Sequence, residues 1–263
     1  LIYPKGFDDF QAFLELVTLA DNLMSDQGYE GDYQYGKFHG KGIRLFADGT
    51  RYQGNFKQGK FHGKGDTVFT DGAHYKGDYK QGKEHGKGTY TWKNGDHYEG
   101  DWQNGKFHGK GVISYTDGTQ YKGELKYGNA HGKGFMNYVS GSSYEGYYQY
   151  GKYHGQGVMN YANGTLYRGA YQNGKAHGKG METYASGKKY VGQFIDGLYH
   201  GKGEILNPNG SKITGTFKDG DPFGKATLTT AEGEVFTARS SEPGVCYRLK
   251  SYRATECPQL EGW

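Results

Sequence analysis

Aromatic, glycine and polar positions alternate along most of the chain in a pattern that returns every 23 residues. The central motif is Tyr-x-Gly-x-aromatic, as at Tyr29, Gly31 and Tyr33, and a period of two places these side chains on one face of a β-strand. The tyrosine recurs without an insertion as Tyr52, Tyr75, Tyr98, Tyr121, Tyr144, Tyr167 and Tyr190, and Ile213 takes the ninth place. A fixed period of this length predicts a repeat protein.

Each repeat continues with a glycine-rich segment and a second polar-aromatic stretch. In the first repeat, residues 36–42 (Gly-Lys-Phe-His-Gly-Lys-Gly) are expected to form a loop, and Gly42, Arg44 and Phe46 share a face of a second strand. A two-residue turn at Asp48-Gly49 then leads into the next repeat, because Asp-Gly and Asn-Gly favour tight hairpin turns. The sequence therefore predicts two antiparallel strands per repeat.

These units resemble the MORN repeat, in the form YxGxWxxGKxHGxGxxxxxdGxxY. The resemblance covers residues 29–235, with eight full units and a degenerate ninth in which Pro222-Phe223 replaces the aromatic-His pair. Relatives of this repeat sometimes flank a catalytic domain, such as a lipid kinase or a methyltransferase, and no such domain fits in the residues outside the repeats. Relatives bind helical segments of partners in an aromatic groove or form homodimers, at membranes and cytoskeletal structures, and the family name refers to proposed membrane association.

The repeat pattern predicts an all-β fold, a single-layer, elongated and twisted antiparallel meander of hairpins. With 4.7–4.9 Å between strands, each repeat advances roughly 9.5 Å, which gives a ribbon on the order of 80 Å long. Aromatic side chains from neighbouring strands are expected to cover the gaps that strand glycines leave. The predicted parts are an N-terminal segment (1–28), the ribbon (29–235) and a C-terminal tail or cap (236–263).

The two ends carry features outside the repeat. Apolar residues over 7–24 have helical spacing and predict an amphipathic helix, which either covers the end of the sheet or docks on a partner or membrane. Cys246 and Cys257 are expected to be bonded if the protein is secreted, and free thiols if it is cytosolic. The chain begins at Leu1 rather than Met, which leaves a removed signal peptide, and therefore secretion, open.

Composition and motifs argue against enzymes and cofactors. The chain has 32 Lys and Arg against 28 Asp and Glu, a formal net charge of +4, which is too small to predict nucleic-acid binding. No nucleophile with a base and an orienting acid stands outside the repeat. The segment 82–89 has three residues between its glycines and then Lys-Gly, whereas a phosphate-binding loop needs four and then Lys-Ser or Lys-Thr.

Eight of the ten histidines occupy one repeated position. Equivalent histidines are roughly 9.5 Å apart and point the same way, too far to share a zinc ion. We expect each ring to pack beneath its loop and bond a backbone or tyrosine group, with a titratable array as the alternative.

Thirteen lysines of the glycine-rich segments are predicted to lie along one edge of the ribbon. They either keep the ribbon soluble or attract anionic lipid headgroups or acidic proteins such as tubulin. The candidate anion-binding and lipid-binding residues are Lys37, Lys41, Lys60, Lys64, Lys83, Lys87, Lys106 and Lys110.

The aromatic face is the second candidate site, because a single-layer sheet cannot bury both faces and Tyr and Trp are common interface anchors. These rings either bind a peptide or helix or stack on one another. The candidate partner-binding residues are Tyr52, Phe56, Phe69, Tyr75, Tyr79, Trp92, Tyr98, Trp102, Tyr115 and Tyr121.

The sequence favours a cytoplasmic scaffold that binds a protein partner, with homodimerisation open, at a cytoskeletal or membrane-associated assembly. The alternative is a peripheral membrane protein that binds anionic phospholipids through the lysine edge, and a detached regulatory module of an enzyme is a third. The first hypothesis predicts that Trp102→Ala abolishes partner binding while lysine changes do little, and the second predicts the reverse.

Overall fold

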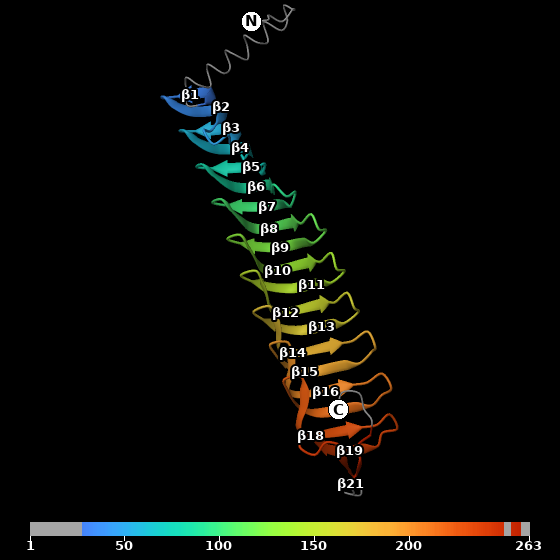
Figure 1. Ribbon diagram of the computed structural model, residues 1–263. Coiled ribbons are helices and arrows are strands. Elements are labelled where there is room, and N and C mark those ends of the chain that lie inside the picture. Colours follow the sequence, from blue (N-terminus) through green and yellow to red (C-terminus); the bar gives the residue numbers. More distant parts are fainter. Residues whose placement is uncertain (1–27, 250–253, 259–263) are drawn as a thin grey trace, which may run out of the picture. The chain divides into compact units, whose positions relative to one another are not determined.

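The computed structural model describes residues 28–249 and 254–258, and these form an all-β fold (Figure 1). Their 21 strands make one open antiparallel sheet, in which each strand pairs with its neighbours along the chain, so the topology is a meander. No helix occurs in this described part of the chain. The amphipathic helix predicted over residues 7–24 lies outside the described residues.

The chain divides into two compact units. Unit 1 comprises Leu1–Asp117 and Leu125–Gly128, and unit 2 comprises Gly118–Glu124 and Asn129–Trp263, so the boundary runs through β9 (Gln120–Lys126). The other strands of unit 1 are β1 (Tyr29–Gln34), β2 (Lys37–Leu45), β3 (Arg51–Lys57), β4 (Lys60–Val68), β5 (His74–Lys80), β6 (Lys83–Thr91), β7 (His97–Gln103) and β8 (Lys106–Ser114). Those of unit 2 are β10 (Asn129–Asn137), β11 (Ser143–Gln149), β12 (Lys152–Asn160), β13 (Leu166–Gln172), β14 (Lys175–Thr183), β15 (Lys189–Ile195), β16 (Leu198–Leu206), β17 (Lys212–Lys218), β18 (Asp221–Thr229), β19 (Val235–Arg239), β20 (Val245–Arg248) and β21 (Ala254–Glu256).

The glycine-rich segment of each repeat is mostly strand, which corrects the loop expected over residues 36–42. In the second repeat, Gln58 and Gly59 form a two-residue turn with φ of 52° and 79°, and Lys57 already pairs with Lys60. Two positive φ values are typical of the type I′ turn, whose twist matches that of a hairpin. The register then shifts between Gly54 and Phe56, where the opposite strand carries Gly63 at φ 62°. This bulge leaves the His-Gly step within the strand.

The connection between repeats is longer than the two-residue Asp-Gly turn that the sequence suggested. Between β4 and β5, the Phe69 amide donates to the Ala73 carbonyl at 2.9 Å, and the Gly72 amide donates to the Phe69 carbonyl at 3.0 Å. The Asp71 carboxylate also accepts the Ala73 amide at 2.9 Å. The side chain of Asp71 therefore stabilises a five-residue connection, and Phe69 lies just beyond the strand rather than in it.

The interior of a repeat is a tyrosine ring lying over a pair of strand glycines. Gly54 of β3 pairs with Gly65 of β4, and a Cβ on Gly65 would lie 2.5 Å from Tyr52 Cε2. Tyr52 is fully buried, and its ring stacks on Phe61 at 3.7 Å between centroids. Its hydroxyl donates to the Asn55 carbonyl at 2.8 Å. The glycine gaps are therefore covered as expected, and the covering ring comes from the neighbouring strand of the same hairpin.

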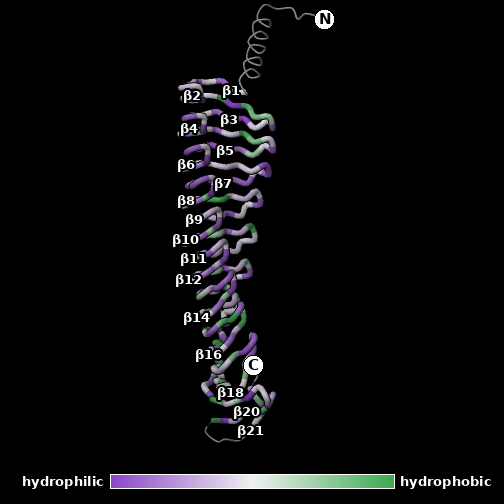
Figure 2. Tube along the Cα trace, turned by 90° about the vertical axis from the view of Figure 1, so that its left-hand side faces the viewer, coloured by the Kyte–Doolittle hydropathy of each residue, from purple (hydrophilic) through white to green (hydrophobic). Residues whose placement is uncertain are grey.

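Hydropathy explains why this interior is inconspicuous in the sequence. The trace in Figure 2 is mostly hydrophilic or neutral, with only short hydrophobic stretches. The largest fully buried side chains in the described residues include seven tyrosines, which replace the aliphatic residues of an ordinary core. Burial raises the pKa of these phenols, as at Tyr190, where it rises to about 12.

A second buried ring, present in most repeats, supports a paired stability prediction. The Tyr79 hydroxyl bonds the Thr67 hydroxyl at 2.5 Å, whereas the buried Tyr148 hydroxyl has no hydrogen-bond partner in the described part of the chain. For Tyr148, the position equivalent to Thr67 is occupied by Met136 of the preceding repeat. We expect Tyr148→Phe to stabilise the fold slightly and Tyr79→Phe to destabilise it by about 1 kcal/mol, because only the second removes a made hydrogen bond.

Urea unfolding midpoints of the two variants check this prediction. Both substitutions delete one hydroxyl from the same repeat position, so each serves as the control for the other. Equal shifts of the same sign would contradict the assignment of Tyr148 as an unsatisfied buried group.

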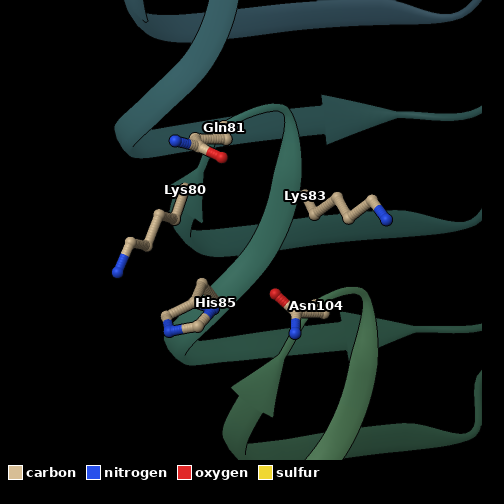
Figure 3. Close-up of a pocket in the computed structure, with 5 residues that line it drawn as sticks. All are labelled: Lys80, Gln81, Lys83, His85 and Asn104. Carbon is tan, nitrogen blue, oxygen red and sulfur yellow. The ribbon is translucent and has the colours of Figure 1, made fainter.

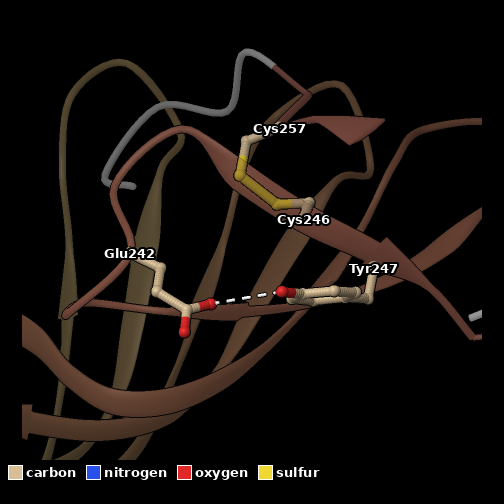
Figure 4. The surroundings of a disulfide bond; sticks show 4 residues. All are labelled: Glu242, Cys246, Tyr247 and Cys257. Carbon is tan, nitrogen blue, oxygen red and sulfur yellow. Dashed lines mark hydrogen bonds between the residues drawn. A yellow bond between two sulfur atoms is a disulfide. The ribbon is translucent and has the colours of Figure 1, made fainter. Parts of the chain in front are cut away.

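Three short strands end the sheet. Cys246 of β20 is fully buried and forms a disulfide with Cys257, which follows β21 (Figure 4). The Tyr247 hydroxyl donates to the Glu242 carboxylate at 3.4 Å beside it. The bonded cysteines match the alternative that the sequence linked to secretion, since disulfides persist mainly in oxidising compartments.

Candidate functional site

Most of the aromatic residues predicted to bind a partner lie in the interior. Seven of the ten are buried, with exposed fractions of 0–7%. The seven are Tyr52, Phe56, Tyr75, Tyr79, Tyr98, Trp102 and Tyr121. Each central tyrosine lies flat over its glycine pair and flanking rings close over it edge-on, as Phe56 and Tyr79 do around Tyr52 at 5.0 and 5.3 Å. The accessible members of the predicted set are Phe69, Trp92 and Tyr115.

These three accessible rings occupy one position of the repeat, namely the residue that directly follows the second strand of each hairpin. We call the rings at this position the outer aromatic row. Its members in unit 1 are Phe46, Phe69, Trp92 and Tyr115, and those in unit 2 are Tyr138, Tyr161 and Tyr184. Tyr115 and Tyr161 are 39% and 43% exposed, and the others are half-buried.

Backbone hydrogen bonds fix the row. The Trp92 amide donates to the Asp96 carbonyl and the Gly95 amide donates to the Trp92 carbonyl, both at 2.9 Å, and the same pair of bonds holds Tyr161. Rings on a fixed backbone have little conformational entropy left to lose when a ligand covers them.

Three of the four rings of the row in unit 1, Phe46, Phe69 and Trp92, carry no hydroxyl group. Trp92 packs edge-on against Tyr90 at 5.0 Å and against Phe107 at 5.6 Å. Arg44 lies over Phe46 with its guanidinium carbon 4.5 Å from the ring centroid. These rings can offer van der Waals contact and, at Phe46, a cation already stacked on the ring.

The row of unit 2 carries hydroxyl groups instead. The hydroxyls of Tyr138 and Tyr153 are hydrogen-bonded to each other. The hydroxyls of Tyr184 and Tyr199 both donate to Glu182 Oε2, at 2.9 and 2.7 Å. The row of unit 2 therefore offers hydrogen-bonding and acidic groups, whereas most rings of the row in unit 1 carry no hydroxyl.

Sequence reasoning missed part of this face. Phe46, Tyr138, Tyr161 and Tyr184 share the repeat position of Trp92, so the 23-residue register alone could have placed them. Glu182 had a weaker signal, as an acid at a position that is otherwise neutral or, once, arginine. The equivalent residues are Arg44, Thr67, Tyr90, Ile113, Met136, Met159, Ile205 and Leu228.

The predicted lysine edge separates into two sets. Lys37, Lys60, Lys83 and Lys106 begin strands beside the hairpin turns, and the second set, Lys41, Lys64, Lys87 and Lys110, lies four residues further within the same strands. Lys64 pairs with Asp78 at 2.8 Å and Lys87 pairs with Asp101 at 2.6 Å.

Carboxylates on the neighbouring strand weaken this positive field. Partial burial alone would raise the pKa of Asp78, but the hydrogen bonds from the Lys64 ammonium and the Lys87 amide outweigh it and hold that pKa below its usual value. Asp78 is therefore ionised at neutral pH and offsets the charge of Lys64, on the face opposite the aromatic rings.

The histidines also face away from the aromatic side. His85 pairs across the strands with Asp78, and its Nδ1, like that of His108, is buried without a hydrogen-bond partner in the described residues. The expected hydrogen bond is thus missing at these two positions. His85 lines a shallow recess with Lys80, Gln81, Lys83 and Asn104, and Figure 3 shows the two lysines pointing away from each other. The recess does not gather positive charge on one point.

The described residues contain neither a candidate metal site nor a candidate membrane-spanning helix. No three His, Cys, Asp or Glu side chains within 28–249 and 254–258 come together as a metal site would require. In the same residues we find no helix with the length and apolar character needed to cross a bilayer.

Solved structures show only distant likeness. The TCP10 domain of Danio rerio CPAP in complex with a peptide of Danio rerio STIL has a TM-score of 0.44 at 10% identity, covering 81% of this chain and 99% of that one. The Drosophila melanogaster SAS-4 (dCPAP) TCP domain in complex with a proline-rich motif of Ana2 (dSTIL) has a TM-score of 0.37 at 15% identity, covering 68% and 90%. Likeness at this level supports no inference about this chain.

The sequence comparisons give a firmer result. No curated protein matches the chain, and residues 1–55 match a protein family of unknown function (DUF1415). The MORN repeat matches seven consecutive segments, 52–74, 75–97, 98–120, 121–143, 144–166, 167–189 and 190–212. These segments have the register of the tyrosine motif and together cover more than half of the sequence. The chain belongs to the MORN-repeat family.

Proposed function

We propose that the protein is a non-catalytic scaffold that binds a segment of a partner protein on its outer aromatic row. The observation that carries this proposal is a half-buried or exposed ring at the same position of seven repeats, beside an interior that is already packed. Backbone hydrogen bonds hold such rings in place, as at Trp92 and Tyr161. The interior rings already cover one another. The exposed area of the outer aromatic row therefore remains available for an interface with a partner. Tyr and Trp are the residues that most often anchor such interfaces.

The lysine edge is the weaker candidate. Two of its lysines pair with carboxylates, and the lysines that flank the turns stand on short hairpin ends where charge also serves solubility. Binding of anionic phospholipids through this edge is therefore the alternative to peptide binding by the row. The experiment described below must distinguish the two.

The kind of partner and the location of the protein are also part of this proposal. A cytoskeletal or membrane-associated assembly in the cytoplasm fits a scaffold of this family, and a second copy of the chain is a possible partner. The disulfide between Cys246 and Cys257 favours an oxidising compartment instead, so the secreted alternative stays part of the proposal to be tested.

Removing one exposed ring tests the proposal. Peptides selected from a displayed random library against the whole protein should bind Tyr161→Ser at least about tenfold more weakly, because a central aromatic anchor contributes about 2 kcal/mol. Tyr150→Ser is the matched control, since Tyr150 is 74% exposed but lies at a hairpin turn outside the row. Unfolding midpoints of both variants should equal that of the parent protein.

The opposite pattern would overturn the proposal. A library that yields no peptide sensitive to Tyr161→Ser contradicts a binding role for the row. Sedimentation with phosphoinositide vesicles at physiological salt, lost on changing Lys37, Lys60, Lys83 and Lys106 to Gln, would transfer the function to the lysine edge.

A further inference from the structure

One carboxylate, that of Glu182, lies on the aromatic side of unit 2. The fold does not require a charged residue at this position. Glu182 is a half-buried residue of β14, and the equivalent residues of the two preceding repeats are Met136 and Met159. Apolar side chains fill this position in repeats with the same hairpin, so packing does not require the acid. A partly desolvated carboxylate costs free energy unless something pairs with it.

Two phenols hold the carboxylate in place. The hydroxyl oxygens of Tyr184 and Tyr199 lie 2.9 and 2.7 Å from Oε2 and are hydrogen-bonded to each other at 2.5 Å, so the two phenol protons serve three contacts. Tyr199 in turn stacks on the buried Tyr190, with 3.6 Å between centroids and 8° between planes. The position of Glu182 Oε2 is therefore fixed by a ring that cannot move without disturbing the interior.

The negative charge of Glu182 also acts on a third tyrosine, Tyr161. Burial raises the pKa of Tyr161, and the negative charge of Glu182 raises it further. Tyr161 belongs to the outer aromatic row and is 43% exposed. The carboxylate contacts Tyr184 and Tyr199 directly and acts on the accessible Tyr161 through its charge.

This charge has no cationic partner among residues 28–249 and 254–258. Among the described residues, no Lys or Arg nitrogen lies within 4.0 Å of Glu182, whereas Glu204 on the opposite face pairs with Lys212 at 3.1 Å. Hydroxyl donors satisfy Oε2 but leave the negative charge uncompensated. Lys188 places its Nζ 5.9 Å from the centre of the Tyr184 ring, so a positive group is accommodated beside this ring.

We propose that Glu182, together with Tyr161, Tyr184 and Tyr199, binds a lysine or arginine side chain of the partner protein. The carboxylate supplies the charge-assisted hydrogen bond, and the tyrosine rings supply faces that attract a cation and the apolar stem behind it. A metal ion fits less well, because the two hydroxyls donate hydrogen bonds into the site instead of offering lone pairs. This inference rests on the proposed function and names the chemistry of the partner in unit 2.

The test uses the library peptides whose binding depends on Tyr161. We expect each to contain an arginine or lysine whose replacement by neutral citrulline or norleucine weakens binding to the parent protein about tenfold. Against Glu182→Gln, which keeps the shape and an acceptor oxygen, the same replacement should change binding by less than twofold. The difference should shrink at high salt.

Glu145→Gln is the matched control, because it removes the same charge from an exposed position on the face opposite the aromatic rings. It should leave the arginine effect intact. The two failures are distinguishable, since peptides that require Tyr161 but bind Glu182→Gln as well as the parent would overturn only this inference. An arginine effect that persists in full in Glu182→Gln would do the same, and the lack of any Tyr161-dependent peptide would overturn the proposed function and this inference together.

Discussion

Gly65→Ala is expected to unfold its repeat, at a cost of about 3 kcal/mol or more. The added Cβ would lie 2.5 Å from Tyr52 Cε2 and 2.6 Å from the hydroxyl oxygen of that ring. Tyr52 cannot retreat, because Phe61 stacks on it at 3.7 Å and its hydroxyl is bonded to the Asn55 carbonyl. Relief requires either lifting a buried ring off the sheet or separating β3 from β4, and both expose the interior.

The same hairpin provides the control for this prediction. Gly59→Ala also replaces a glycine by alanine, but no atom lies within 4 Å of the added Cβ and only its φ of 79° is unfavourable, which costs about 1 kcal/mol. Urea unfolding gives the two free-energy changes, and amide hydrogen exchange shows whether the loss is confined to the repeats around β3 and β4, as nearest-neighbour stability predicts. A smaller loss for Gly65→Ala than for Gly59→Ala would contradict the ring-over-glycine interior.

The sequence predicted the architecture because the repeat carries it redundantly. Two strands per repeat, the antiparallel meander and the covering of glycines all follow from the Tyr-x-Gly-x-aromatic spacing, repeated in fixed register. Strand limits were predicted less well, because residues such as Gln58 adopt a positive φ that their side chains do not signal. Gly63 added to the error, since a glycine in a bulge looks the same in the sequence as a glycine in a loop.

Burial was the property that the sequence could not supply. Alternation assigns Tyr52, Phe56 and Phe69 to one side of the sheet, but it does not say which of them the others cover. That depends on ring-to-ring distances of 5–6 Å across neighbouring repeats, which arise only when the hairpins pack. The proposed site therefore lies on the row that follows each second strand instead of on the predicted rings. The proposed role of Glu182 depends on its contacts with two tyrosine hydroxyls, which the sequence does not indicate.

The burial of Trp102 changes the result expected for Trp102→Ala, the experiment that the sequence alone suggests. The ring is 7% exposed and packs edge-on against Phe107 at 4.7 Å and Tyr75 at 4.9 Å. Its indole nitrogen donates to the Gly88 carbonyl at 3.1 Å. A partner can reach little of this side chain, so its removal acts on the fold of unit 1 before it acts on any interface.

Trp102→Ala is therefore expected to lower the free energy of unfolding by about 3–5 kcal/mol, the usual cost of deleting a buried large aromatic side chain and leaving a cavity. Any loss of peptide binding should follow from that instability and should recover at lower temperature or with the conservative Trp102→Phe. Tyr161→Ser provides the contrast, with binding lost and the unfolding midpoint unchanged. Urea unfolding and peptide titration of the two variants, measured together, decide the question. A Trp102→Ala protein that keeps its unfolding midpoint and yet loses the peptide would place Trp102 in the interface and overturn the assignment of the buried rings to the interior.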